Sequence, residues 1–418
     1  MLSKWQWLVK QLTRTLWVRA LLFSLLAIAS ALLSVLLDPF IPEGLAGVIG
    51  ADAVDHILDI LAGSMLAVTT FSLTVMVSAY SAATSSVTPR ATRLLMQDTT
   101  SQNVLSTFLG SFLFSLVGIV ALSAGVYGPR GRVILFVVSL VVIGLVVLAL
   151  LRWISHLTHF GRVGDTTERV ETATANALDY WRRCPAMGGQ VLRDPQSTIP
   201  AHAMPIYPDG VAYVEHLDIG QLNECAEKFN CNVYVDAVAG AFVHPRTPLL
   251  WVDSSSDSGL TEAMRAAYTL APERSFDQDP RFGLCVLAEI ASRALSPAVN
   301  DPGTAIDVLG RGVRVLTQYL APLSSPENIA YARVWVPPLA FEDMLNDFFM
   351  PISRDGAGMI EVQVRVQKSL HALFCNAPPW VQGDLLTHAR IALERAESAL
   401  TLPSEKQALL QLHQRLFE

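Results

Sequence analysis

Residues 60–83 read ILAGSMLAVTTFSLTVMVSAYSAA, a run of 24 residues without a charged side chain. An α-helix rises about 1.5 Å per residue and the hydrocarbon core of a bilayer is about 30 Å thick, so about 20 apolar residues are enough to cross it. The stretch is therefore predicted to be a transmembrane helix. Because glycine, alanine, serine and threonine recur along it, the helix is expected to have a face of small side chains.

This face carries only small or hydroxylated residues and ends near a carboxylate. At about 100° per residue, its members fall within an arc of roughly 80°. They are Gly63, Ala67, Thr70, Thr74, Ser78, Ser81 and Ser85, and Asp59 continues the line at the N-terminal end. Small residues let helices approach closely in lipid, whereas hydroxyl groups and carboxylates also line aqueous pores for cations. A helix–helix contact and a pore lining that attracts a small cation both remain open.

Three further stretches are apolar and long enough to cross a bilayer, so four transmembrane helices are expected in residues 1–160. They are Ala20–Leu37, Val104–Val126 and Val133–Leu151. Lysine and arginine favour the cytoplasmic side of a membrane. These residues precede the first span and follow the last, whereas residues 38–59 contain none. The sequence therefore predicts a multi-pass membrane protein with a cytoplasmic N-terminus and a cytoplasmic C-terminus.

The rest of the chain differs from this membrane part in its content of charged residues. Only 16% of the 418 residues are charged, compared with about 25% in a soluble domain. Residues 1–160 hold nine basic and six acidic residues, and residues 161–418 hold 21 and 31. The acidic second part repels phosphate backbones, so nucleic acid is not an expected partner.

The second part is expected to be a cytoplasmic α+β domain. Residues 161–200 are interpreted as a linker helix and loop. Residues 201–256 contain short alternating segments, which predict a small β-barrel or sandwich. Residues 257–418 follow helical periodicity and predict a mainly helical subdomain.

Two Asp-Pro pairs begin helices in this domain, at Asp279 and at Asp301. Aspartate accepts hydrogen bonds from the free amides of a first helical turn and proline fits the next position, so a structural role explains both pairs. A polar ligand or a partner segment is the alternative, with Asp279, Arg281, Asn300 and Asp301 as candidate residues.

The sequence lacks the common catalytic motifs. It has no phosphate-binding loop, no zinc-protease helix, no serine-hydrolase elbow and no EF-hand loop. Its five cysteines are odd in number and no two have the C-x-x-C spacing, so neither a disulfide framework nor a zinc site is expected. No cofactor, no metal and no catalytic residue are predicted, and a membrane enzyme ranks third among the functions considered.

Several stretches resemble a family of bacterial predicted membrane proteins, domain of unknown function 2254. The most specific is ALSPAVNDPGTA at residues 294–305; DPRFGL at residues 279–284 and FSLTVMV at residues 71–77 add to it. The family's usual Gly-Asp-Phe-Val is Gly-Ala-Phe-Val here, at residues 240–243. The resemblance implies an inner-membrane protein with four N-terminal spans and a cytoplasmic domain, and it implies no particular activity.

Two functions from different classes follow as hypotheses. The first is an oligomeric pore or transport protein lined by the second predicted span, with the cytoplasmic domain used for assembly or gating. Four helices are too few to enclose a water-filled path, so this hypothesis requires a homo-oligomer. The second is a membrane-anchored sensor or scaffold whose cytoplasmic domain binds a ligand or a protein.

Overall fold

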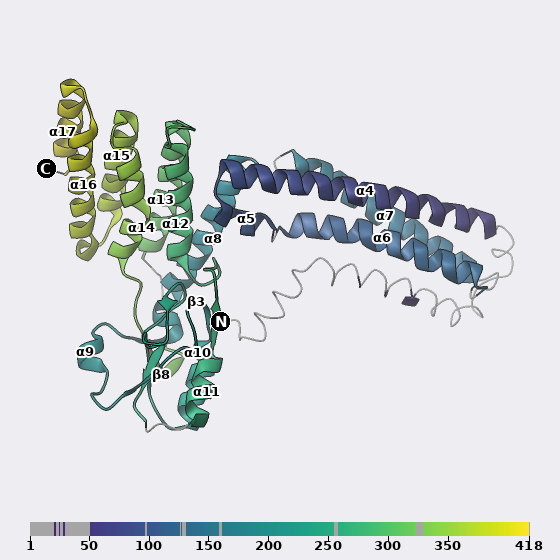
Figure 1. Ribbon diagram of the computed structural model, residues 1–418, viewed down its shortest axis with the longest axis horizontal. Coiled ribbons are helices and arrows are strands. Elements are labelled where there is room, and N and C mark those ends of the chain that lie inside the picture. The colour runs from purple at the N-terminus through teal and green to yellow at the C-terminus, as the bar shows by residue number, and fades with distance from the viewer. Residues whose placement is uncertain are drawn as a thin grey trace. The chain divides into compact units, whose positions relative to one another are not determined.

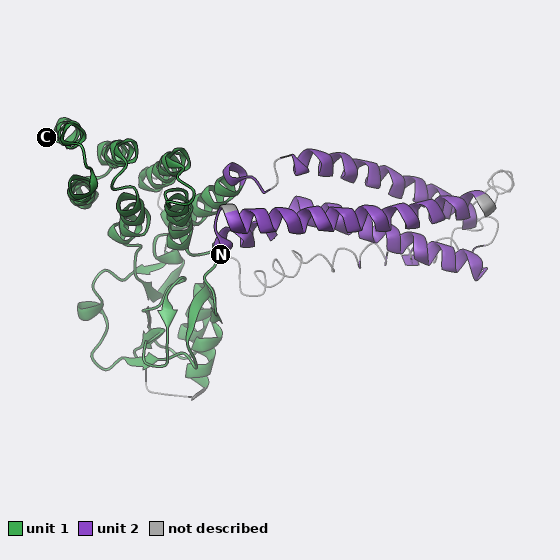
Figure 2. Ribbon diagram, turned by 45° about the horizontal axis from the view of Figure 1, so that its top comes forward, with its two compact units in different colours: residues 1–4, 166–418 green, residues 5–165 purple. Residues whose placement is uncertain are grey.

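The computed structural model describes residues 21, 25, 28, 29 and 51–417, except residues 97, 126, 128–130, 159–160, 255–257 and 323–328. The first predicted span, Ala20–Leu37, lies outside the described residues apart from those four positions. The chain divides into two compact units, shown in Figure 2. The N-terminal unit is residues 5–165, and the C-terminal unit is residues 166–418 together with residues 1–4.

Four described helices form most of the N-terminal unit. They are α4 (Ala51–Ser86), α5 (Pro89–Met96), α6 (Thr99–Ser123) and α7 (Gly131–Leu157). Figure 1 shows α4, α6 and α7 running side by side. These three helices are long and apolar enough to cross a membrane. They coincide with the second, third and fourth predicted spans.

Helix α4 is longer than the predicted span because its first turns also pack on α6. It has 36 residues and begins nine residues before Ile60. Val54 and Leu58 of these added turns are buried in a core with Phe108 and Phe114 of α6. Hydropathy thus located the start of the apolar run at Ile60. The start of the helix at Ala51 depends on packing against α6, which hydropathy does not report.

The contact between α4 and α6 depends on small residues of α6. A Cβ atom added at Gly118 would lie 3.0 Å from Leu58 Cδ1. Ser111 and Ser115 are fully buried, and each hydroxyl donates a hydrogen bond to the carbonyl four residues earlier in its own helix. Small side chains with satisfied hydroxyls thus allow two apolar helices to lie close together.

The C-terminal unit contains two sheets. Their strands are β1 (Gly189–Val191), β2 (Met204–Ile206), β3 (Ala212–Leu217), β4 (Val233–Val235), β5 (Phe242–Val243), β6 (Leu250–Val252), β7 (Tyr268–Ala271) and β8 (Tyr331–Val336). The five-stranded sheet has the order β1-β8-β4-β6-β2, and the three-stranded sheet has the order β5-β3-β7. The strands share one core that includes Val233, Leu250 and Val334.

This arrangement is more elaborate than a small barrel or sandwich within residues 201–256, and that expectation is not confirmed. Strand β8 begins about 80 residues after the end of β6. It pairs in parallel with both β1 and β4. Parallel pairing requires a long crossover connection. Here the connection from β4 to β8 includes three helices, at Ser258–Ala266, Pro280–Ala294 and Pro302–Leu320.

Short helices surround the strands, and six long helices follow. The C-terminal unit begins with the long helix α8 (Val163–Arg183). The short helices are η2 (Pro185–Gly188), α9 (Pro195–Thr198), α10 (Ile219–Lys228) and α11 (Ser258–Ala266). The long ones are α12 (Pro280–Ala294), α13 (Pro302–Leu320), α14 (Phe341–Asp355), α15 (Ile360–Asn376), α16 (Pro379–Ala399) and α17 (Pro403–Phe417). Figure 2 shows these six helices in two rows. One row is α12, α14 and α16, and the other is α13, α15 and α17.

Buried aromatic and aliphatic side chains hold the two rows together. Phe348 and Phe349 of α14 are fully buried and pack edge to face. A Cβ atom at Gly312 of α13 would lie 2.1 Å from Phe348 Cζ, so only a glycine lets α13 pass over this ring. The result is a stack of three helical hairpins, in which each hairpin packs on the next.

Candidate functional site

All eight residues of the predicted α4 face are exposed in the part of the chain that the structure describes. They are Asp59, Gly63, Ala67, Thr70, Thr74, Ser78, Ser81 and Ser85. The side of α4 that packs on α6 is formed by other residues, among them Leu58, Leu61 and Met65. Packing among α4, α6 and α7 therefore does not use this line of small residues.

Bulky apolar side chains are exposed on α4 beside this face. Leu66, Phe71, Leu73 and Val77 are each close to half exposed or more. Side chains of this kind suit contact with lipid chains. Helix α4 therefore presents two surfaces, one that is bulky and apolar and one that is small and hydroxylated.

The threonine hydroxyls of the small face are bonded within the helix. Thr70 Oγ1 donates to the carbonyl of Leu66 at 2.9 Å, and Thr74 Oγ1 donates to the carbonyl of Thr70 at 3.0 Å. A hydroxyl that uses its proton in this way keeps its oxygen lone pairs as acceptors. The face thus offers acceptor oxygens, which suit water and cations.

The N-terminal end of α4 is acidic. Asp55 and Asp59 are both exposed and lie four residues apart, so they fall on the same side of the helix. Residues 51–86 contain no lysine and no arginine. The end of the helix that carries Asp59 therefore presents acidic side chains that no basic side chain of α4 neutralises.

The opposite end of the helices carries a polar cluster that sequence analysis missed. His156 Nε2 lies 3.0 Å from Asp98 Oδ2 and 3.2 Å from Ser101 Oγ. Asp98 also accepts from the amide and the hydroxyl of Ser101, each at 2.7 Å, and thereby caps α6. His156 belongs to the last turn of α7, so the cluster joins the start of α6 to the end of α7.

This Ser-His-Asp set is not arranged as a hydrolase triad. In a triad the serine and the aspartate contact different ring nitrogens of the histidine. Here the same Nε2 atom contacts both partners. Its geometry is that of a clamp between helix ends. The capping position of Asp98 was the only sequence signal for it.

In the C-terminal unit, Asp279 is buried and fully engaged by protein groups. It accepts from the amide of Phe282 at 3.0 Å and from Arg274 Nε and Nη2 at 2.7 and 3.0 Å. A Cβ atom at Gly240, whose φ is +91°, would lie 2.2 Å from its Oδ2 atom. Burial raises the pKa of Asp279, and the hydrogen bonds from Arg274 oppose that rise. Asp279 thus fastens the start of α12, and both of its oxygens are already in use.

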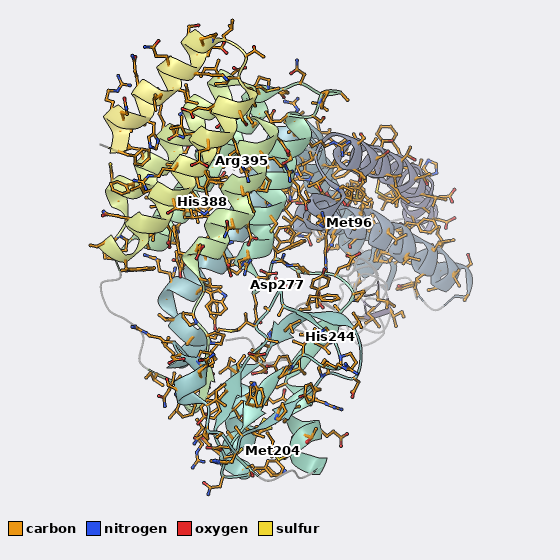
Figure 3. All side chains as sticks on the ribbon, turned by 60° about the vertical axis from the view of Figure 1, so that its left-hand side comes forward. Met96, Met204, His244, Asp277, His388 and Arg395 are labelled. Atoms are coloured by element: carbon orange, nitrogen blue, oxygen red, sulfur yellow. The ribbon has the colours of Figure 1, made fainter. Side chains whose placement is uncertain are left out.

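Arg281 joins α12 to α14. Its Nε lies 2.6 Å from Asp347 Oδ2, and its Nη1 lies 2.6 Å from Asp343 Oδ2. Asp277, labelled in Figure 3, lies in the segment between β7 and α12, where the strands meet the helical hairpins. Hydrogen bonds between Gln278 and the backbone of Leu217 connect the segment before α12 to β3.

Asn300 and Asp301 lie beyond the other end of α12. The 15 residues of that helix span about 20 Å, so the four predicted residues form two separate pairs. Asn300 has a φ of +51°, and Asp301 accepts from the amide and the hydroxyl of Thr304 at 3.0 and 2.6 Å. These bonds lower the pKa of Asp301. Both residues are exposed.

No cluster of three or more metal-ligating side chains occurs among the described residues. Of the residues predicted from the sequence, the exposed ones are the small face of α4 and the pair Asn300 and Asp301 before α13.

Comparisons with known proteins agree with a membrane location. The chain is 26% identical over 302 residues to an uncharacterised protein of Mycobacterium bovis and, at the same identity, to one of Mycobacterium tuberculosis. The match covers 69% of this chain and 57% of each relative, so the chain spans little more than half of their length. No solved structure matches. The family model of predicted membrane proteins, domain of unknown function 2254, matches residues 13–372, and the chain belongs to this family.

Proposed function

We propose that the protein is a homo-oligomeric pore or transport protein of the bacterial inner membrane, lined by α4. In this proposal both termini are cytoplasmic and the C-terminal unit serves assembly or gating. The observation that carries it is the exposure of all eight small or acidic residues on a 36-residue helix whose other side packs on α6.

Charge and hydrogen bonding favour a cation as the permeant species. In an oligomer the α4 faces would line a central path, and Asp59 would repeat as a ring at its mouth. Rings of carboxylates concentrate cations, and the threonine oxygens would offer acceptors further along the path.

The decisive experiment measures assembly and conductance on the same reconstituted sample. Thr74→Leu should leave the oligomer in place and block conductance, because a ring of bulky apolar groups dewets a narrow pore. Val77→Leu, on the bulky exposed surface of α4, is the matched control and should conduct as the wild type does. A monomeric wild type, a wild type without conductance, or an assembled Thr74→Leu protein with unchanged conductance would refute the proposal.

The acidic mouth has its own test. Asp59→Asn should lower the preference for cations over anions, and most strongly at low salt, because ions screen the charge at high salt. Reversal potentials under a salt gradient measure this preference. An unchanged reversal potential at low salt would remove Asp59 from the conduction path.

The orientation can be tested with an impermeant thiol reagent in intact cells. Cys375 is exposed in the C-terminal unit and Ala53 is exposed near the start of α4. A cysteine at Ala53 should react, and Cys375 should react only after the cells are opened. The reverse pattern would overturn the charge-based orientation.

A second candidate function is a membrane-anchored scaffold that binds a partner at the loop of residues 296–301. Val299 is 51% exposed there, on a loop ordered by hydrogen bonds from Asn300 N to Ser296 O and from Asp301 N to Ala294 O, both at 2.8 Å. In this proposal Asp279 and Arg281 hold the opposite end of α12 in place.

A photo-crosslinking residue at Val299 tests the scaffold proposal. It should give one adduct of reproducible mass in cells, whereas the same residue at Val211, which is also exposed, should not. Equal labelling at both positions would indicate that the loop has no specific partner.

A further inference from the structure

A cavity of about 210 Å³ opens on the C-terminal unit where four distant segments meet. These are the end of α8 with η2, the end of α13, the connection from β8 to α14, and the start of α16. Apolar and aromatic side chains form most of its wall, including Trp181, Tyr319, Leu339 and Trp380. Trp380 is 70% exposed, although tryptophan is usually well buried. The cavity therefore displays aromatic surface that the protein itself does not cover.

One cation belongs to this otherwise apolar wall. Arg182 lines the cavity, donates through Nη2 to Asp179 at 2.8 Å and contacts the carbonyl of Ala321 through Nη1 at 3.4 Å. Its Nε atom is buried and has no hydrogen-bond partner among the described residues. A buried N–H group without a partner is costly, and the described residues leave part of the hydrogen-bonding capacity of the Arg182 guanidinium unused.

The local charge balance is positive. Asp179 forms ion pairs with both Arg182 and Arg183, so one carboxylate is shared by two guanidinium groups. The hydrogen bond from Arg182 lowers the pKa of Asp179, which keeps this carboxylate ionised at neutral pH. The cavity lining contains no acidic residue. The lining thus places one guanidinium and no carboxylate next to aromatic surface.

We infer that this cavity binds a small organic anion with an apolar body, such as an aromatic or short aliphatic carboxylate. The body packs against Trp380 and Tyr319, and the carboxylate pairs with the guanidinium of Arg182. Pockets for drug-sized ligands have volumes of about 300–1,000 Å³, so this smaller cavity suits a ligand with a single ring or a short chain. The inference concerns the C-terminal unit alone and does not depend on the pore proposal.

The test compares a charged probe with its neutral counterpart on the full chain in nanodiscs. Fluorine NMR line broadening of 4-fluorobenzoate and of 4-fluorobenzamide reports binding of each. The carboxylate should bind at least about tenfold more tightly than the amide, because a hydrogen bond between charged groups is stronger than one to a neutral acceptor. Absence of carboxylate binding, or equal binding of the two probes, would overturn the inference.

Variants then locate the binding. Arg182→Gln should weaken 4-fluorobenzoate binding by about tenfold or more, because it removes the positive charge and the guanidinium donors from the cavity wall. Arg183→Gln is the matched control, because Arg183 pairs with the same Asp179 but does not line the cavity. It should change binding by less than about twofold.

The variant Trp380→Ala distinguishes a loss of the binding site from a loss of folding. Its exposed side chain contributes little to the core, so the variant should fold normally and still lose most of the binding. Unchanged binding by a folded Trp380→Ala protein, or equal losses in the Arg182 and Arg183 variants, would place the probe elsewhere and refute the assigned site.

Discussion

Helix α6 of the N-terminal unit buries small side chains beside large apolar ones, whereas α14 of the C-terminal unit buries mainly large apolar ones. In the N-terminal unit, α6 buries Ser106, Ser111, Ser115 and Gly118, whereas Val120 on the same helix is exposed. In the C-terminal unit, α14 buries mainly large apolar side chains, among them Leu345, Phe348 and Ile352. The difference follows from the surroundings. Water drives apolar groups into a core, whereas lipid is as apolar as leucine and leaves close packing as the main stabilising force between helices.

Buried polar groups are also satisfied differently in the two units. In the N-terminal unit, Ser115 and Ser139 donate to carbonyls of their own helices. In the C-terminal unit, Gln367 of α15 donates to the carbonyl of Ala389 in α16, and its Oε1 contacts His413 Nδ1 of α17 at 2.9 Å. A bond within one helix satisfies a hydroxyl without contacting a neighbouring helix, whereas bonds across three helices fix their register.

The largest expected effect comes from emptying the C-terminal core. Phe348→Ala should destabilise this unit by about 3–5 kcal/mol, because it removes a fully buried ring and leaves a cavity. Hydrogen exchange of peptides from α12–α16 measures the loss. Val141→Ala, at an exposed position of α7, is the control and should leave exchange in its own unit nearly unchanged. Similar losses in both variants would contradict the contrast between the units.

A smaller effect is expected from filling a close contact in the N-terminal unit. Gly118→Val should destabilise the α4–α6 pair by about 1–3 kcal/mol, because the added side chain meets Leu58. Val120→Leu adds volume on the exposed side and should be nearly neutral. Unfolding of the purified protein by sodium dodecyl sulfate measures both. If the two variants behave alike, close approach of α4 and α6 does not limit stability.

Sequence reasoning succeeded where a signal is contained within one element. Apolar runs of about 20 residues predicted α4, α6 and α7, and the Asp-Pro pairs predicted the starts of α12 and α13. The family resemblance is confirmed by the match over residues 13–372. A 100° periodicity also identified the small face of α4, but it gives only relative angles, so the exposure of that face required the neighbouring helices.

Contacts between distant residues were beyond a single sequence. Arg281 pairs with aspartates 62 and 66 residues away, and His156 meets Ser101 across 55 residues. The cavity beside Arg182 is formed by four segments, none of which has a recognisable motif. The grouping of Asp279 with Asp301 followed from their shared Asp-Pro sequence, and the length of α12 keeps the two residues apart.

The exposed cap of α13 should have a smaller effect than either packing change. Asp301→Ala should cost about 1 kcal/mol of stability in the C-terminal unit, and Asp301→Asn should be nearly neutral at pH 7. Because the bonds from Thr304 lower the folded pKa of Asp301, its ionised form stabilises the fold above the ordinary carboxyl pKa of about 3.9 and this contribution is lost as pH falls. Thermal unfolding from pH 7 to pH 3 should therefore show a shallower decline for the Asn variant. Identical pH profiles would remove Asp301 from the acid response.

The last prediction changes no residue and compares two native thiols of the C-terminal unit. Burial, assisted by the charge of Asp347, raises the pKa of Cys285 to about 11, whereas Cys375 is exposed. Because the thiolate is the reactive form, alkylation of Cys285 by iodoacetamide should be slow at pH 7.5 and should rise about tenfold per pH unit. Mass spectrometry of the two peptides measures both rates. In Phe348→Ala, an opened C-terminal unit should bring the rate at Cys285 toward that at Cys375. If Cys285 already reacts as fast as Cys375 in the folded wild type, the interior around α12 is wetter than its packing indicates, and the contrast between a dry C-terminal core and a closely packed membrane unit weakens.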